Sequence, residues 1–163
     1  MWFHPGTTNR AMSTLHLLEG FLFPESAISS EIIQAYLETE YFIHSDPIIG
    51  LLIGEANPQL LEAHKQQHTN SSAFITAWNP EGQVLSGEEN AERHQRLLHE
   101  LANRSLKFIE GIGQHPSNDW PGETSVLVFG LTLDAAKILG AKHQQNAIVW
   151  SGADAIPQLI LLR

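Results

Sequence analysis

The sequence predicts an α/β (α+β) domain in which a single-layer mixed sheet of about five or six strands is covered by helices. Short apolar segments bounded by turn residues alternate with amphipathic segments that carry helix caps, which is the pattern of strands and helices packed together. The length of 163 residues suits one core, so we expect 1–163 to form one domain. No internal repeat or low-complexity segment divides it.

The first half of the chain predicts two helices and two strands. Ser29-Ser30-Glu31 before the apolar residues of 32–37 predicts a short amphipathic helix with a serine cap. Asn57 followed by Pro58 predicts a second helix to about His68, because proline is favoured in the first helical turn. The predicted strands of this half are one over 41–44 and 48–53, which a turn at 45–47 interrupts, and one over 73–78.

The second half predicts two further helices and four strands. Ser86 with Glu89 three residues later forms a capping box, which predicts a helix over 87–103. Thr132 predicts the cap of a last helix that ends at about Lys142. A long polar loop is expected over 111–124, and loops of this length in a compact domain are often functional. The predicted strands are 106–110, 125–129, 147–150 and 158–162.

Composition and charge exclude several classes of protein. A formal net charge of −9 disfavours binding to nucleic acid or to an anionic membrane surface. The absence of cysteine excludes disulfides, thiolate metal sites and a cysteine nucleophile, and it agrees with a cytoplasmic location. No segment has the length of a membrane span or the pattern of a signal peptide. No cofactor is expected.

The first eleven residues show no hydrophobic periodicity, and a second methionine follows at position 12. We interpret 1–11 as a disordered or mis-annotated leader, with Met12 as an alternative start of translation. In that case the aromatic residues of this segment have no role in function.

The helix predicted over 87–103 carries polar side chains on its apolar stripe. At about 100° per residue, Asn90 and His94 continue the stripe formed by Leu97 and Leu101, and Arg93 lies on its flank. Buried polar groups need partners. One interpretation is structural, with Asn90 holding carbonyls of the turn at 79–85 and His94 bonded to a neighbouring backbone group. The other is a ligand bound near the helix start.

Other residues are weaker candidates for chemistry. His64 and His68 have the i, i+4 spacing of a metal-binding pair, but no third ligand accompanies them, so we expect no metal. His115 in the polar loop is a candidate for acid–base chemistry, and Trp120 is either a packing anchor or a lid over a ligand. Gly111-Ile112-Gly113 lacks the third glycine of a dinucleotide fingerprint and is interpreted as part of the loop.

Four segments together resemble a known family. FITAWNP, ENAERHQRLLHEL, GIGQHPSNDWPGETSVLV and QQNAIVWSGAD occur in the order and spacing of the bacterial domain of unknown function 3293 (DUF3293), and we place this family-like core at 41–160. The resemblance implies a small cytoplasmic bacterial domain without a known activity. One departure is that family members have an aromatic residue and a glycine before a single Gln-Asn, whereas this chain has His143-Gln144-Gln145-Asn146. The site residues it implies are Asn79, Pro80, Glu89, Asn90, Arg93, Trp120, Glu123, Gln145 and Asn146.

Three classes of function are consistent with these residues. The preferred class is a domain that binds a small polar or anionic ligand near the start of the helix at 87–103. Its ligand-binding candidates are Asn79, Asn90, Arg93, Trp120, Gln145 and Asn146. The second class is a metal-independent hydrolase or transferase that uses a Glu/His acid–base pair, with the candidates Glu89, His94, His115 and Glu123. The third is a protein-interaction module in which the polar cluster is purely structural.

Overall fold

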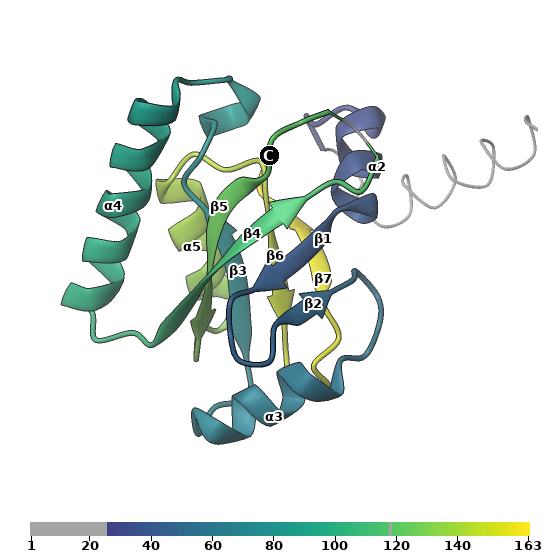
Figure 1. The fold of residues 1–163 in the computed structure, drawn as a ribbon, viewed down its shortest axis with the longest axis vertical. Helices are drawn as coiled ribbons and strands as arrows, with labels where there is room; N and C mark the ends of the chain where they lie inside the picture. Colours follow the sequence, from purple (N-terminus) through teal and green to yellow (C-terminus); the bar gives the residue numbers. More distant parts are fainter. Residues whose placement is uncertain (1–25, 118) are drawn as a thin grey trace, which may run out of the picture.

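The computed structural model describes residues 26–117 and 119–163. The leader predicted at 1–11 and the alternative start at Met12 lie outside these residues. The described part contains four α-helices and seven strands (Figure 1). The helices are α2 (Ser30–Glu38), α3 (Pro58–Gln66), α4 (Gly87–Asn103) and α5 (Leu133–Lys142). The strands are β1 (Glu40–Ile43), β2 (Ile49–Leu51), β3 (Ser72–Thr76), β4 (Phe108–Gln114), β5 (Glu123–Phe129), β6 (Ala147–Ser151) and β7 (Gln158–Leu161).

The helix starts agree with the predicted caps. The side chains of Ser29, Asn57, Ser86 and Thr132 each accept a hydrogen bond from a backbone N–H in the first turn of their helix. Such bonds satisfy donors that have no partner inside the helix. The capping box of Ser86 and Glu89 is complete, and the helix at 87–103 has the predicted bounds.

The prediction of a mixed sheet with five or six strands was wrong. The seven strands form one sheet in the order β2-β1-β4-β5-β3-β6-β7, and every pair is antiparallel. Figure 1 shows that the sheet is strongly curled, as in half of a barrel. The described chain is therefore an α+β domain. Strand direction depends on contacts between distant segments, which hydrophobic periodicity does not report.

The two faces of the sheet bury different cores. On the convex face, α4 and α5 cover alternate residues of β3 and β5, including Ile75, Val126 and Val128. On the concave face, Tyr41 and Ile43 of β1 share a core with Val149 of β6, although three strands lie between β1 and β6. The curl of the sheet brings these strands into contact. Helices α2 and α3 lie near opposite ends of the sheet (Figure 1).

The loop expected over 111–124 is shorter than predicted. Strand β4 continues to Gln114 and β5 begins at Glu123, so the connection is 115–122. The glycines of β4 interrupt the apolar pattern by which a strand is recognised in sequence. The structure explains the glycine at 111, because a Cβ atom there would overlap the carbonyl oxygen of Phe42 in β1. Glycine in a strand permits such close backbone approach and a sharp bend.

The two edges of the curled sheet are joined by their connecting loops. The N–H of Gly54, after β2, donates to the carbonyl of Pro157, before β7, at 2.8 Å. The N–H of Asn57 donates to the carbonyl of Ala155 at 3.1 Å. We call these two hydrogen bonds the clasp, because they link segments about a hundred residues apart in the sequence.

Candidate functional site

The antiparallel topology brings most predicted site residues to one end of the sheet. The starts of β1, β5 and β6 and the ends of β3, β4 and β7 lie side by side there. In Figure 1 this is the end near α2 and the C-terminus. We call it the polar end of the sheet. The expectation that the turn after β3, the start of α4 and the entries to β5 and β6 meet is confirmed by the hydrogen bonds described below.

Asn79 is the centre of the network at this end. Its side-chain amide donates to Oε1 of Glu123 at 2.8 Å, and its Oδ1 accepts from the N–H of Leu85 at 3.1 Å and from Nδ2 of Asn90 at 2.9 Å. Asn79 has a φ of 45°, in the left-handed region that asparagine tolerates better than most residues. Its side chain therefore joins β5, the turn after β3 and α4.

Asn90 has the partners that the structural interpretation required. It is 2% exposed, and its Oδ1 accepts from the backbone N–H of Asn79 at 2.9 Å. Its Nδ2 also donates to the carbonyl of Leu85 at 3.4 Å. The prediction that Asn90 holds the turn at 79–85 is confirmed, and its hydrogen-bonding groups are used inside the protein.

Arg93 likewise has internal acceptors. Its Nε donates to the carbonyl of Ala77 at 2.7 Å, and its Nη2 donates to the carbonyl of His143 at 2.9 Å. Nη1 lies 3.4 Å from Oε1 of Gln144. The guanidinium thereby connects α4 to the end of β3 and to the segment after α5. This geometry favours a structural role for Arg93, and its role as an anion-binding residue stays a prediction.

Gln145 and Asn146 precede β6 and are both 7% exposed. Nε2 of Gln145 donates to the carbonyls of Trp78 and His143, both at 3.1 Å. Gln144 has a φ of 58°. It therefore adopts the left-handed conformation that the glycine of the family pattern would favour, so the backbone turn is present without that glycine.

Glu123 differs from its neighbours because it keeps hydrogen-bonding capacity. It is partly buried, and Asn79 is the only hydrogen-bond partner of its carboxylate among the described residues. Burial raises the pKa of Glu123, and the hydrogen bond from Asn79 only partly offsets this. No ion pair of Glu123 is present in the part of the chain that the structure describes. A partly buried carboxyl group with one neutral partner is therefore the most chemically available group here.

Two tyrosines, Tyr36 and Tyr41, lie near Glu123. The strand register places Tyr41, Gly113 and Glu123 in one row across β1, β4 and β5. Gly113 has no side chain, so β4 places nothing between Tyr41 and Glu123 on this face. Burial raises the pKa of Tyr41 and of Tyr36, and the negative charge of Glu123 adds to both increases.

The rim of this region is formed by α2 and the chain after β7. The hydroxyl of Tyr41 donates to the carbonyl of Tyr36 at 2.7 Å. Nδ2 of Asn146 donates to the hydroxyl oxygen of Tyr36 at 3.3 Å, and Oδ1 of Asn146 accepts from Arg163 at 3.1 Å. Arg163 also lies 3.9 Å from the carboxylate of Glu81. Tyr36 and Arg163 were not predicted as site residues, because only the packed structure brings α2 and β7 together.

The two histidine candidates pair with other carboxylates. Nε2 of His94 lies 2.8 Å from Oε1 of Glu110, which corrects the expectation of a neighbouring backbone partner. Nε2 of His115 lies 2.9 Å from Oε2 of Glu38 in α2. Among the described residues neither histidine contacts Glu123. Glu110 and Glu38 were missed because they are distant from their histidines in sequence.

Glu89 and Trp120 lie outside the network of Asn79. Glu89 accepts hydrogen bonds from the hydroxyl and the N–H of Ser86, and these bonds lower its pKa. Its carboxylate therefore serves the capping box. Trp120 is 62% exposed on the connection between β4 and β5, and its role as a lid stays a prediction.

His64 and His68 do not form a pair on one helix face. His64 is 1% exposed, and its Nε2 lies 2.8 Å from Oγ of buried Ser72. His68 is beyond the end of α3 and has a φ of 55°. Within 26–117 and 119–163, no cluster of three or more His, Asp or Glu side chains could hold a metal ion. None of the helices in these ranges is long and apolar enough for a transmembrane segment.

Comparisons with known proteins identify part of the chain. No curated protein and no solved structure matches the sequence. One family model, described as "Protein of unknown function (DUF3293)", matches residues 75–148. The match is shorter than the predicted 41–160, but it runs from β3 to β6 and includes Asn79, Asn90 and Glu123. Over residues 75–148 the resemblance is confirmed, because this segment matches the model of DUF3293, a family of unknown function.

Proposed function

We propose that the polar end of the sheet binds a small polar ligand and that Glu123 is the main group in contact with it. The observation that carries this proposal is the partly buried carboxyl group of Glu123, which has one neutral partner and no cation among the described residues. Placing a carboxylate in such surroundings costs stability unless something pairs with it. A ligand that donates hydrogen bonds to Glu123 supplies that pairing.

The surrounding residues support a defined chemical class. The free lone pairs of Glu123 favour an amine, amidine or hydroxyl group on the ligand. The aromatic ring of Tyr41 is buried beside Gly113 and packs against Phe74, so the side of this region toward the concave core is apolar. Arg163 at the rim is a cation that can pair with an anionic group of the same molecule. The ligand then has a donor group toward Glu123 and, where it is anionic, its negative end toward Arg163.

A second observation points to the same end of the sheet. The indole N–H of Trp78, one residue before Asn79, is buried and has no hydrogen-bond partner in the described part of the chain. Such groups are rare in native proteins, and each calls for an explanation. The residues Asn79, Glu81 and Gln144 also have positive φ values, and strained backbone is concentrated at binding sites.

Binding is favoured over catalysis by the placement of the histidines. Acid–base catalysis with Glu123 as the base requires a proton donor within reach. His94 and His115 are each engaged with another carboxylate, Glu110 and Glu38 respectively. Within the described residues, the hydrolase or transferase alternative therefore has no histidine hydrogen-bonded to Glu123 as its acid.

Native mass spectrometry of the purified protein, followed by thermal-shift screening of polar metabolites, tests the proposal. We expect a compound with an amine, amidine or hydroxyl group to raise the melting temperature of the wild type. Glu123→Gln should abolish this shift while the fold is kept, because the glutamine carbonyl can still accept from Asn79. Glu88→Gln, at an exposed position in the first turn of α4, is the matched control and should keep the shift. A ligand whose shift survives in Glu123→Gln would contradict the assignment.

A further inference from the structure

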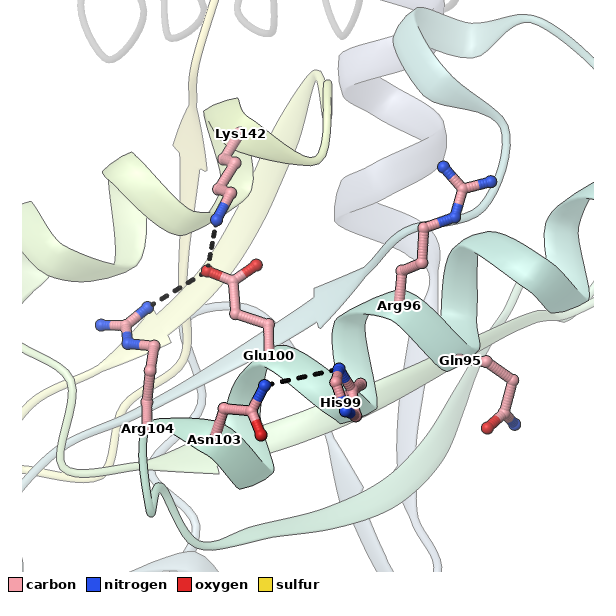
Figure 2. A pocket seen from close by; sticks show the side chains of 7 residues that line it. All are labelled: Gln95, Arg96, His99, Glu100, Asn103, Arg104 and Lys142. Carbon is pink, nitrogen blue, oxygen red and sulfur yellow. Dashed lines mark hydrogen bonds and ion pairs between the residues drawn. The ribbon is translucent and has the colours of Figure 1, made fainter.

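A second polar region lies between α4 and α5, away from Glu123. Figure 2 shows a shallow depression lined by side chains from the second half of α4 and the last turn of α5. We call it the α4–α5 depression. Its charged side chains are Arg96, Glu100, Arg104 and Lys142, and His99 lies among them. Arg96, Arg104 and Lys142 are three of only nine Lys and Arg residues in a chain with a net charge of −9.

Two cations of this depression, Lys142 and Arg104, converge on one carboxylate. Nζ of Lys142 and Nη1 of Arg104 lie 2.9 and 3.6 Å from the same oxygen of Glu100, Oε1. Nε2 of His143 lies 3.0 Å from the other oxygen. Burial acts to raise the pKa of Glu100, but the hydrogen bonds and charges of Lys142 and His143 outweigh it and lower the pKa. The depression therefore already coordinates one oxyanion, which belongs to the protein.

The same cations have donors left for a second anion. An ammonium group has three N–H donors, and a guanidinium has five. Lys142 is 63% exposed and Arg104 is 44% exposed, so their remaining donors face solvent. Arg96 is 69% exposed, and it is 3.7 Å from Glu92 of the preceding turn. Arg96 is balanced by Glu92, whereas Lys142 and Arg104 share the single carboxylate of Glu100, which leaves one positive charge for an incoming anion.

We propose that the α4–α5 depression binds a small oxyanion, and that the phosphate group of a small metabolite is its ligand class. A phosphate presents several acceptor oxygens, which suit an arginine fork and a lysine that converge on one point. Arg104 and Lys142 bind the anion directly, and Arg96 and His99 form the rim. The inference is independent of the function proposed for Glu123, because it rests on other residues and on the opposite sign of charge.

A titration with inorganic pyrophosphate, followed by ¹H–¹⁵N NMR spectra of the full chain, tests this proposal. We expect saturable shifts of backbone amides in 96–104 and near Lys142. Lys142→Gln should weaken binding about two- to fivefold, the amount that one exposed ionic contact contributes. The matched control is Lys137→Gln, which removes the same charge from an exposed position of the same helix. It should change the dissociation constant much less.

A second variant separates specific binding from general attraction. Glu100→Gln removes the internal competitor and should tighten pyrophosphate binding, because Lys142 and Arg104 are then released. The absence of saturable shifts would overturn the proposal, and so would equal weakening by Lys142→Gln and Lys137→Gln. Glu123→Gln should leave pyrophosphate binding unchanged, so a failure at the polar end of the sheet can be distinguished from a failure here.

Discussion

Glu123 and Glu100 mark the two polar regions of this molecule, and their pKa values move in opposite directions. Glu123 has an amide as its neighbour, and burial raises its pKa. Glu100 is also partly buried, but Lys142 and His143 bond to it and its pKa is lowered. Burial alone therefore does not set the pKa of a carboxyl group. The charges and hydrogen bonds around it decide whether its ionised or its protonated form is stable.

The regions also differ in how their polar groups are used. At the polar end of the sheet, Asn79, Asn90 and Arg93 direct their hydrogen bonds to the protein and connect α4 to the turn after β3. In the α4–α5 depression, the long side chains of Arg96 and Arg104 reach solvent. One helix therefore has a structural polar half and an exposed charged half, and substitutions can separate the two.

The largest effect should come from Asn90→Leu. This change leaves the N–H of Asn79 and the carbonyl of Leu85 without their partner, and unpaired buried groups cost about 1 to 3 kcal/mol each. We expect the free energy of unfolding to fall by about 2 to 4 kcal/mol in chemical denaturation. Asn103→Leu, at an exposed position near the end of α4, is the control and should have little effect. Equal decreases in the free energy of unfolding of the two variants would show that the hydrogen bonds of Asn90 do not stabilise the fold as described.

A smaller loss is expected from Arg93→Ala. The carbonyl of Ala77 loses this donor and the carbonyl of His143 keeps only Gln145, which should lower the free energy of unfolding by about 1 to 2 kcal/mol. Arg96→Ala, three residues later, removes an exposed ion pair with Glu92 and should cost less than about 0.5 kcal/mol. If Arg96→Ala destabilised the protein as much as Arg93→Ala, the division of α4 into two halves would be wrong.

The smallest but most diagnostic effects concern pH. The raised pKa of Glu123 means that its ionisation opposes folding as pH rises above 4.5, so Glu123→Gln should be more stabilising, or less harmful, at pH 7 than at pH 4. The lowered pKa of Glu100 has the opposite effect on stability as pH rises. Its carboxylate stabilises the fold above pH 4.5, and this contribution is lost as pH falls through the lowered pKa. Glu100→Gln should therefore destabilise more at pH 7 than at low pH.

Thermal melts of both variants and the wild type across this pH range measure these differences. The two glutamine variants should have stability differences of opposite slope against pH. Parallel slopes would mean that the surroundings of the two carboxylates do not differ as described.

The sequence predicted best what depends on local interactions. The caps at Ser29, Asn57, Ser86 and Thr132 are satisfied within one helical turn, so residue type and spacing are enough to locate the helix starts. The helical projection also placed Asn90 and His94 correctly in the core, where they are 2% and 5% exposed.

Features that depend on distant segments were not predictable in the same way. The glycines of β4 resemble a loop in sequence, and only the close approach of the β1 backbone to β4 explains Gly111. His94 finds Glu110 across the helix–sheet interface, and no spacing rule connects the two residues. Tyr36 and Tyr41 are five residues apart in sequence, but Tyr36 meets Asn146, and through it Arg163, only because the sheet curls, and curvature is a property of the whole sheet.

The clasp between 54–57 and 155–157 constrains the order in which the protein can be assembled during synthesis. The loop after β2 emerges from the ribosome about a hundred residues before its partners Ala155 and Pro157. Synthesis at about 5 to 20 residues per second leaves this edge without those bonds for several seconds or more. During this time β1 and β2 form a sheet edge that lacks these hydrogen bonds. The concave core is complete only after the segment before β7 has been synthesised.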